Sequence, residues 1–210
     1  AESITRLASE QGRLLSHRRL VGGLLERKGH ALLQEEVLSD AAGVLARAEP
    51  LLRAPEHAEL RQKALHSLAT AHMKQWLFER AEREFDEVLA LARSRGDRAA
   101  AGCIIGNQGI LYKRQGRLEE ALACYSEALE IHRALRDLKN EAFVLGNLGA
   151  WYLDSGQPKE AMARYEAAMA LHEQTGNARG IAQIHSHMGA ITLDGGDAAA
   201  SRAHYEAALA

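Results

Sequence analysis

The 210-residue chain has little of what secreted, sheet-forming or membrane-spanning proteins need. It contains two cysteines and three prolines, and valine, isoleucine and threonine together number 17. Two cysteines are too few for the disulfide framework of a small secreted domain, and so few β-branched residues disfavour β-sheet. Apolar stretches end well before the roughly 18 residues of a membrane span. The N-terminus also lacks a basic segment followed by an apolar one. We therefore expect a cytoplasmic protein that does not bind membranes.

An excess of charge of one sign is also missing. Lysine and arginine number 26 against 28 aspartate and glutamate residues, which gives a formal net charge of −2. Proteins that depend on phosphate contacts need a concentrated basic surface, because their affinity comes largely from counterion release. Nucleic acid is therefore not an expected partner.

Small and helix-forming residues dominate what is present. The chain has 39 alanines and 30 leucines, a balance that favours helix. It also has 18 glycines, although a glycine inside a helix costs about 1 kcal/mol relative to alanine. The positions of these glycines therefore need a separate explanation.

Many of the glycines follow an internal repeat. The quartet GNQG at 106–109 recurs as GNLG at 146–149 and as SHMG at 186–189, a period of 40 residues. The same register aligns Tyr125 with Tyr165 and Tyr205, and Gly116 with Gly156 and Gly196. A period of this length is typical of repeats that each contribute one supersecondary unit.

Each repeat has the pattern of two helices. In the clearest one, residues 142–155 carry an apolar helical pattern, a turn at 155–157 interrupts it, and Pro158 occupies the first position of a second helix. That helix is expected to run to about Gln174, with Gly176 as the stop at positive φ. Such helix pairs cannot bury their apolar faces alone, so neighbouring pairs are expected to stack into a solenoid.

The order of key residues within a repeat resembles the tetratricopeptide repeat. The residues that carry this likeness are Leu148, Gly149, Tyr152, Gly156, Ala161, Tyr165 and Ala168, and the set recurs from Gln108 to Ala128. The commonest tetratricopeptide repeat has 34 residues, so the 40-residue period is more similar to the longer repeats of Pins-type adaptors, kinesin light chains and peptide-sensing bacterial regulators. The resemblance implies an all-α fold, a right-handed α-α superhelix of antiparallel helix pairs.

The repeat register predicts the domain organisation. We expect one solenoid domain over residues 1–210, with a degenerate N-terminal capping helix at 1–25, repeats at 26–65, 66–105, 106–145 and 146–185, and a partial last repeat at 186–210. Within a pair, Gly109 is expected to face Ala121 and Gly149 to face Ala161, with the tyrosines beside these contacts. Pro50 predicts an early end to the second helix of the first repeat.

One side of the first helices is expected to bind a partner. In tetratricopeptide stacks this side lines a concave groove, and in the related adaptors the asparagines equivalent to Asn107 and Asn147 clamp a peptide backbone. Alternatively, these asparagines bond a helix of the neighbouring repeat. Gly106 and Gly146 fall on the same side, where contact between helices does not explain them. The candidate peptide-binding residues are Asn107, Asn147, His187, Ser67, Lys74, Arg114, Lys113, Lys63, Phe143, Asp154, Gly106 and Gly146.

The charges in this set change sign along the groove. Lys63, Lys74, Lys113 and Arg114 belong to the middle repeats, whereas Asp154 belongs to a later one. An acidic segment of a partner near the basic group is one hypothesis, and a merely solvated surface is the alternative.

Catalytic and metal-binding patterns are not found. The ten histidines show no ligand spacing, and His132 and His172 are one period apart, which favours stacked surface residues. We predict no cofactor, no metal and no enzymatic activity. The leading hypothesis is a scaffold that binds a protein or an extended or helical peptide in its groove. The alternatives are a sensor arm of a larger signalling or transcription-regulator protein, and a homo-oligomer that assembles through an uncapped C-terminal edge.

Overall fold

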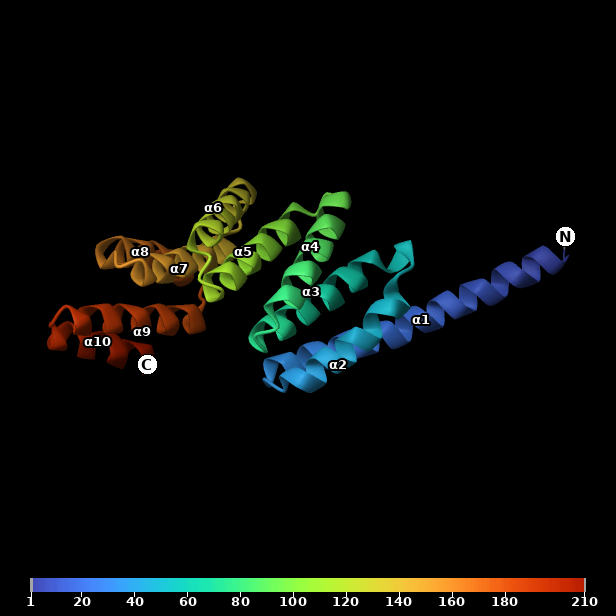
Figure 1. Cartoon of the computed structure of the whole chain (residues 1–210), viewed down its shortest axis with the longest axis horizontal. Helices are drawn as coiled ribbons and strands as arrows, with labels where there is room; N and C mark the ends of the chain where they lie inside the picture. Colours follow the sequence, from blue (N-terminus) through green and yellow to red (C-terminus); the bar gives the residue numbers. More distant parts are fainter. Residues whose placement is uncertain (1, 210) are drawn as a thin grey trace. The chain divides into compact units, whose positions relative to one another are not determined.

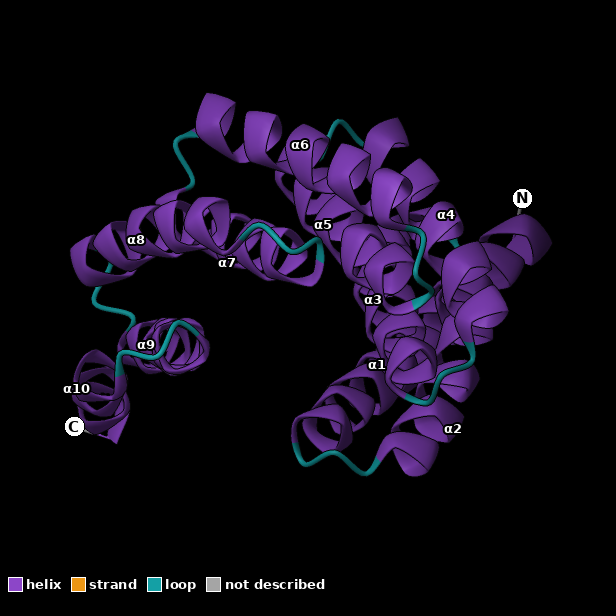
Figure 2. Ribbon diagram, turned by 60° about the vertical axis from the view of Figure 1, so that its left-hand side comes forward, coloured by secondary structure: helices purple, strands orange, loops and turns teal. Residues whose placement is uncertain are grey.

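The computed structural model describes residues 2–209, with side chains from residue 11 onward, and every regular element in this part is helical (Figures 1 and 2). The helices form two compact units that divide after Asp97. The all-α prediction is confirmed. The first unit contains α1 Glu2–Gln34, α2 Leu38–Ala48, the 3₁₀ turns η1 Glu49–Leu52 and η2 Pro55–His57, α3 Ala58–Lys74 and α4 Phe78–Ser94. The second contains α5 Arg98–Arg114, α6 Leu118–Leu135, α7 Leu138–Asp154, α8 Pro158–Gln174, α9 Ala178–Asp194 and α10 Ala198–Leu209.

In the first unit, α1 is one unbroken helix that continues past residue 25, where the sequence pattern placed the end of a capping helix. It packs against α2 and α3 around a core that includes Leu45 and Leu52, both fully buried. The predicted early end of the second helix is confirmed. Helix α2 stops at Ala48, and Pro50 and Pro55 each lie in a short 3₁₀ turn.

In the second unit, the 40-residue period appears as three helix pairs whose first helices begin at residues 98, 138 and 178. Pro158 opens α8, and α8 ends at Gln174, as expected. Gly116, Gly156 and Gly196 lie in the turns within the pairs with φ of 77°, 73° and 84°, a conformation that glycine adopts without steric penalty. The single 1–210 domain and its internal boundaries stay predictions, and Ala210, the last residue of the predicted partial repeat, lies outside the described residues.

The close contact within each pair differs in one respect from the expectation. The nearest neighbour of Gly109 is the ring of Tyr125 rather than Ala121, and that of Gly149 is the ring of Tyr165 rather than Ala161. Both tyrosines are fully buried. The glycines therefore make room for an aromatic ring, which fills the space between the two helices of a pair.

Candidate peptide-binding site

A small recess lies on the second unit, between α7 and α9 and beside the end of α8. Its volume is about 60 Å³. Four predicted residues meet in its lining: Phe143, Gly146, Asn147 and His187. The full set also includes Ala142, Ala150, His172, Gly180, Gln183 and Ile184.

Helical spacing explains how α7 contributes to this recess. Residues 143, 146, 147 and 150 follow an i, i+3, i+4, i+7 pattern, which places them on one side of a helix. Gly146 borders the recess. A Cβ built there would stand 3.4 Å from Cδ1 of Ile184, at the near edge of ordinary van der Waals contact.

Asn147 is the polar group in the recess with the clearest capacity to bind. Its side chain is half-buried, and the amide makes no hydrogen bond to the part of the chain that the structure describes. Asn140 and Asn177, by contrast, are engaged at the starts of helices, where Asp137 accepts from the Asn140 amide and Asn177 accepts from the backbone N–H of Gly180. A half-buried amide without a protein partner can both donate to and accept from a peptide backbone.

His187 lies flat on the ring of Tyr165, with centroids 5.2 Å apart and an interplanar angle of 10°. Burial lowers the pKa of His187, and the nearby positive charge of Lys113 lowers it further. The imidazole is therefore neutral at pH 7, so it offers one N–H donor and one acceptor nitrogen.

His172, which lines the recess, is buried, and so is its repeat equivalent His132. The expectation that these two histidines are surface residues was wrong. His132 is only 1% exposed and His172 only 2%. Asp137 lies 3.2 Å from Nδ1 of His132, and the Asn177 amide lies 3.1 Å from Nδ1 of His172. Both histidines thus lie near the end of the second helix of a pair, close to the residue that precedes the first helix of the next pair.

Phe143 is the apolar element of the recess. It is 42% exposed, and its ring makes an edge contact with the buried His172 at a centroid distance of 5.3 Å. An exposed aromatic ring beside an unpaired amide suits an extended chain, since the ring can cover an apolar side chain while the amide bonds the backbone.

The predicted lysines are paired with carboxylates of the chain itself. Lys113 and Asp154 are 2.8 Å apart and join α5 to α7. Lys63 lies 2.7 Å from Glu59, and Lys74 lies 3.6 Å from Glu36. The predicted groove was expected to change from positive to negative charge between Lys113 and Asp154. These two side chains instead form an ion pair with each other, so they do not act as two separate charges.

The remaining candidates are dispersed. Asn107 is half-buried on α5 and Arg114 is exposed at its end. Gly106 is buried, but a Cβ there would meet Val144 Cγ2 at 3.8 Å, an ordinary contact distance, so close helix packing does not require glycine at this position. Ser67 is buried in the first unit, where its hydroxyl lies 3.4 Å from His30 Nδ1. Lys63 and Lys74 also belong to that unit.

Some lining residues are absent from the sequence prediction. Gln183 is one period after Phe143 and could have been found by extending that row by 40 residues. His172 and Gly180 carried no such signal, because their approach depends on how α8 meets α9: a Cβ on Gly180 would stand 2.7 Å from the His172 ring.

Other chemistry has little support. Cys103 and Cys124 are free thiols. Among the described residues, no three histidine, cysteine or acidic side chains are placed to share a metal ion. None of the described helices combines the length and the apolar character that crossing a bilayer would require.

Comparison with known proteins identifies the family. Family models described as tetratricopeptide repeat match residues 62–95 and 100–174, which together are about half of the chain. The chain belongs to the tetratricopeptide repeat family. No curated protein sequence matches it significantly.

Solved structures show the same fold at low sequence identity. BtubC (BKLC) from P. vanneervenii superposes with a TM-score of 0.73 at 20% identity, over 99% of this chain and 87% of that one. A kinesin light chain-like protein from P. anserina with nearly identical TPR-like repeats gives 0.68 at 15% identity, over 92% and 94%. The Rap conjugation gene regulator of plasmid pLS20, in complex with the Phr* peptide, gives 0.70 at 15% identity, over 91% and 62%.

Proposed function

We propose that this chain is a non-enzymatic scaffold that binds an extended or helical peptide segment across α7 and α9. The observation that carries the proposal is the recess beside Asn147, where an unpaired amide, a neutral imidazole and an exposed aromatic ring lie together. Solenoids use such surfaces of successive repeats to bind extended partners. The similar Rap regulator, which is in complex with a peptide, supports the same use of the fold.

The binding mode follows from the chemistry of the lining. Asn147 would donate to a backbone carbonyl and accept from a backbone N–H of the bound segment. Phe143 would cover an apolar side chain. A recess of about 60 Å³ accepts a small side chain only. Because Lys113 is already paired with Asp154, recognition is expected to depend on backbone and shape more than on net charge.

Phage display of random peptides against the purified chain provides the test, since the proposal specifies no particular peptide sequence. The Kd of the best selected peptide is then measured by calorimetry for the wild type, Asn147→Ala and Phe143→Ala. Loss of a buried hydrogen-bonding or aromatic anchor should weaken binding about 10- to 100-fold.

Gln174→Ala is the matched control for the amide. Gln174 ends α8 and is exposed away from the recess, so its loss should leave the Kd unchanged. Equal affinities of the wild type, Asn147→Ala and Phe143→Ala for every selected peptide would refute the proposed site.

A regulatory sensor arm is the second candidate. It is favoured by the likeness to the Rap regulator, of which this chain covers only 62%. In this case the selected peptide should change the radius of gyration of the chain in X-ray scattering. An unchanged radius at saturation would argue against it.

A further inference from the structure

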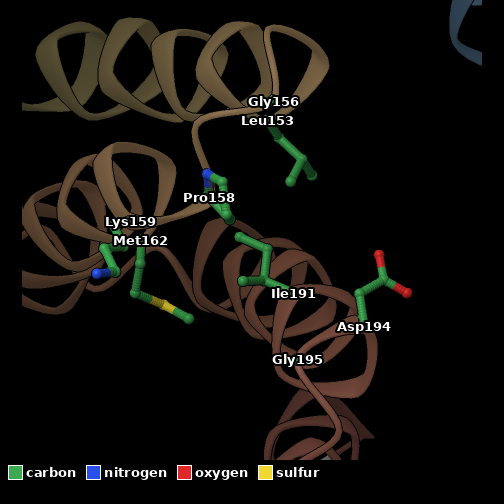
Figure 3. Close-up of a pocket in the computed structure, with 8 residues that line it drawn as sticks. All are labelled: Leu153, Gly156, Pro158, Lys159, Met162, Ile191, Asp194 and Gly195. Carbon is green, nitrogen blue, oxygen red and sulfur yellow. The ribbon is translucent and has the colours of Figure 1, made fainter.

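The larger pocket of the second unit lies away from the recess, at the edge formed by the turns (Figure 3). It has a volume of about 540 Å³ and lies between the α7–α8 turn and the last turns of α9. Leu153, Pro158, Met162 and Ile191 provide its apolar lining, and Lys159 and Asp194 carry its charges (Figure 3).

The preceding repeat shows one way in which the corresponding space is filled. One period before Ile191 stands Trp151, and one period before Pro158 stands Leu118. The indole N–H of Trp151 donates to the backbone carbonyl of Leu118 with a distance of 2.8 Å, so the ring lies against the α5–α6 turn. Helix α7 therefore supplies the indole of Trp151 to the place that, one repeat later, corresponds to the pocket.

In the next repeat the indole is replaced by a smaller side chain. Ile191 occupies the position of Trp151, and Pro158 that of Leu118. Isoleucine has neither the planar area nor the N–H of tryptophan, and a pocket between the turn and α9 results. The carbonyl of Pro158 lies one period after the Leu118 carbonyl, which accepts the hydrogen bond of the indole N–H. The pocket thus corresponds in the repeat register to the place that the indole of Trp151 occupies.

The only other tryptophan of the chain is Trp76, which is 67% exposed in the α3–α4 turn. Its φ is 63°, in the left-handed region, whereas the corresponding turns of the second unit have glycine. This conformation costs a non-glycine residue roughly 1–2 kcal/mol. A strained and exposed tryptophan is the kind of outlier that functional sites retain. The neighbouring Leu77 is 40% exposed, which widens the apolar surface.

We propose that the pocket lined by Pro158, Met162 and Ile191 receives the indole of Trp76 from a second copy of this chain. Trp151 in its own repeat is the template for the contact. An indole buries about 150–250 Å², and buried tryptophans are frequent anchors of protein interfaces. The interface is distinct from the recess beside Asn147.

The charges around the two surfaces allow this contact. Lys74, two residues before Trp76, forms an ion pair with Glu36 at 3.6 Å, and the side chain of Glu36 is 79% exposed. The pocket has one basic residue, Lys159, and one acidic residue, Asp194. Each surface therefore carries both signs, and neither has an excess of one charge that would repel a second copy. Since one copy has one such tryptophan and one such pocket, either a closed dimer or a head-to-tail chain of copies follows.

Sedimentation velocity and tryptophan fluorescence test the proposal. Both are recorded from about 1 to about 100 μM protein, a range that covers the Kd values of weak to moderate interfaces. We expect the mass to rise with concentration and the tryptophan emission to shift to the blue as Trp76 becomes buried. Trp76→Ala should weaken self-association at least about 30-fold. Ile191→Trp should do the same, because the pocket would then be filled from within, as Trp151 fills its own.

Trp76→Ala alters an exposed side chain, so its result does not depend on whether Ile191→Trp folds. Leu135→Ala is the control, because Leu135 is also an exposed apolar residue, 38% exposed, and lies outside the pocket lining. It should associate like the wild type. A wild-type protein that stays monomeric over the whole range, or self-association that persists in Trp76→Ala, would overturn the proposal.

Discussion

The phenol ring of Tyr125 lies directly against Gly109. A Cβ on this glycine would stand 2.6 Å from Cε1 of the ring, closer than real Cβ contacts allow. Gly106, one turn earlier on the same helix, has its nearest side-chain atom at 3.8 Å. The two glycines of the GNQG quartet therefore differ in whether a larger residue such as alanine can replace them.

Gly109→Ala should destabilise the protein by about 1–3 kcal/mol, because the methyl group overpacks a filled core. Gly106→Ala should be neutral or stabilising by up to about 1 kcal/mol, since alanine favours helix and the space exists. Urea denaturation monitored by circular dichroism measures both. If the two variants lose equal stability, the close contact of Gly109 with Tyr125 is not what requires glycine.

Arg136 holds a position that glycine holds in the neighbouring repeats. It caps the end of α6 with φ of 53°, whereas Gly96 and Gly176 take the corresponding positions at 68° and 65°. Arg136→Gly should raise the free energy of unfolding by about 1 kcal/mol through relief of the left-handed strain. Gly176→Ala should lower it by a similar amount. A loss of stability in Arg136→Gly would mean that contacts of the arginine outweigh its strain.

The hydroxyl of Tyr165 is buried and has no hydrogen-bond partner among the described residues. Burial raises its pKa to about 12. In the first unit, Phe85 fills the corresponding place and is fully buried. Since an unpaired buried hydroxyl costs about 1–3 kcal/mol, Tyr165→Phe should leave the stability equal or raise it. A loss above about 1 kcal/mol in thermal or urea denaturation would reveal a bond that the hydroxyl makes in solution.

Acidification should destabilise the fold through its buried and half-buried histidines. Desolvation lowers the pKa of His66, His172 and His187 below the ordinary value of 6.5. The unfolded chain then binds more protons than the folded one below that value, so stability is fully present above about pH 6.5 and declines as the pH falls through the folded pKa. Urea denaturation at pH 7.5 and pH 5.5 should show this decline. His172→Gln should make it shallower, and an unchanged pH dependence would contradict the contribution of His172.

The periodic part of the fold was predictable because its determinants are local. The turn glycines, Pro158 at a helix start and Gly176 at a helix end act within a few residues, so their spacing in the sequence fixes the helix bounds. Pro50 likewise predicted the early end of α2, which stops at Ala48. The tetratricopeptide resemblance then supplied the way in which such pairs pack.

The site was only partly predictable, because it depends on which helices meet. Phe143, Asn147 and His187 were predicted on one side of the first helices and do line one recess, but whether a partner binds there is still a prediction. The pairing of Lys113 with Asp154 arises from contact between α5 and α7, which no local pattern encodes. The burial of His132 and His172 was missed for the same reason: repeat-equivalent positions can point into the stack or out of it.

The most direct test of the proposed function uses the four asparagines of the chain, Asn107, Asn140, Asn147 and Asn177. Selective ¹⁵N labelling of asparagine gives each side-chain amide its own pair of resonances, which are assigned by single substitution. Titration with the peptide selected by phage display should shift the Asn147 amide most. It should leave Asn140 and Asn177 in place, because they are bonded at helix starts. An Asn147 resonance that does not move while the peptide binds would contradict the account.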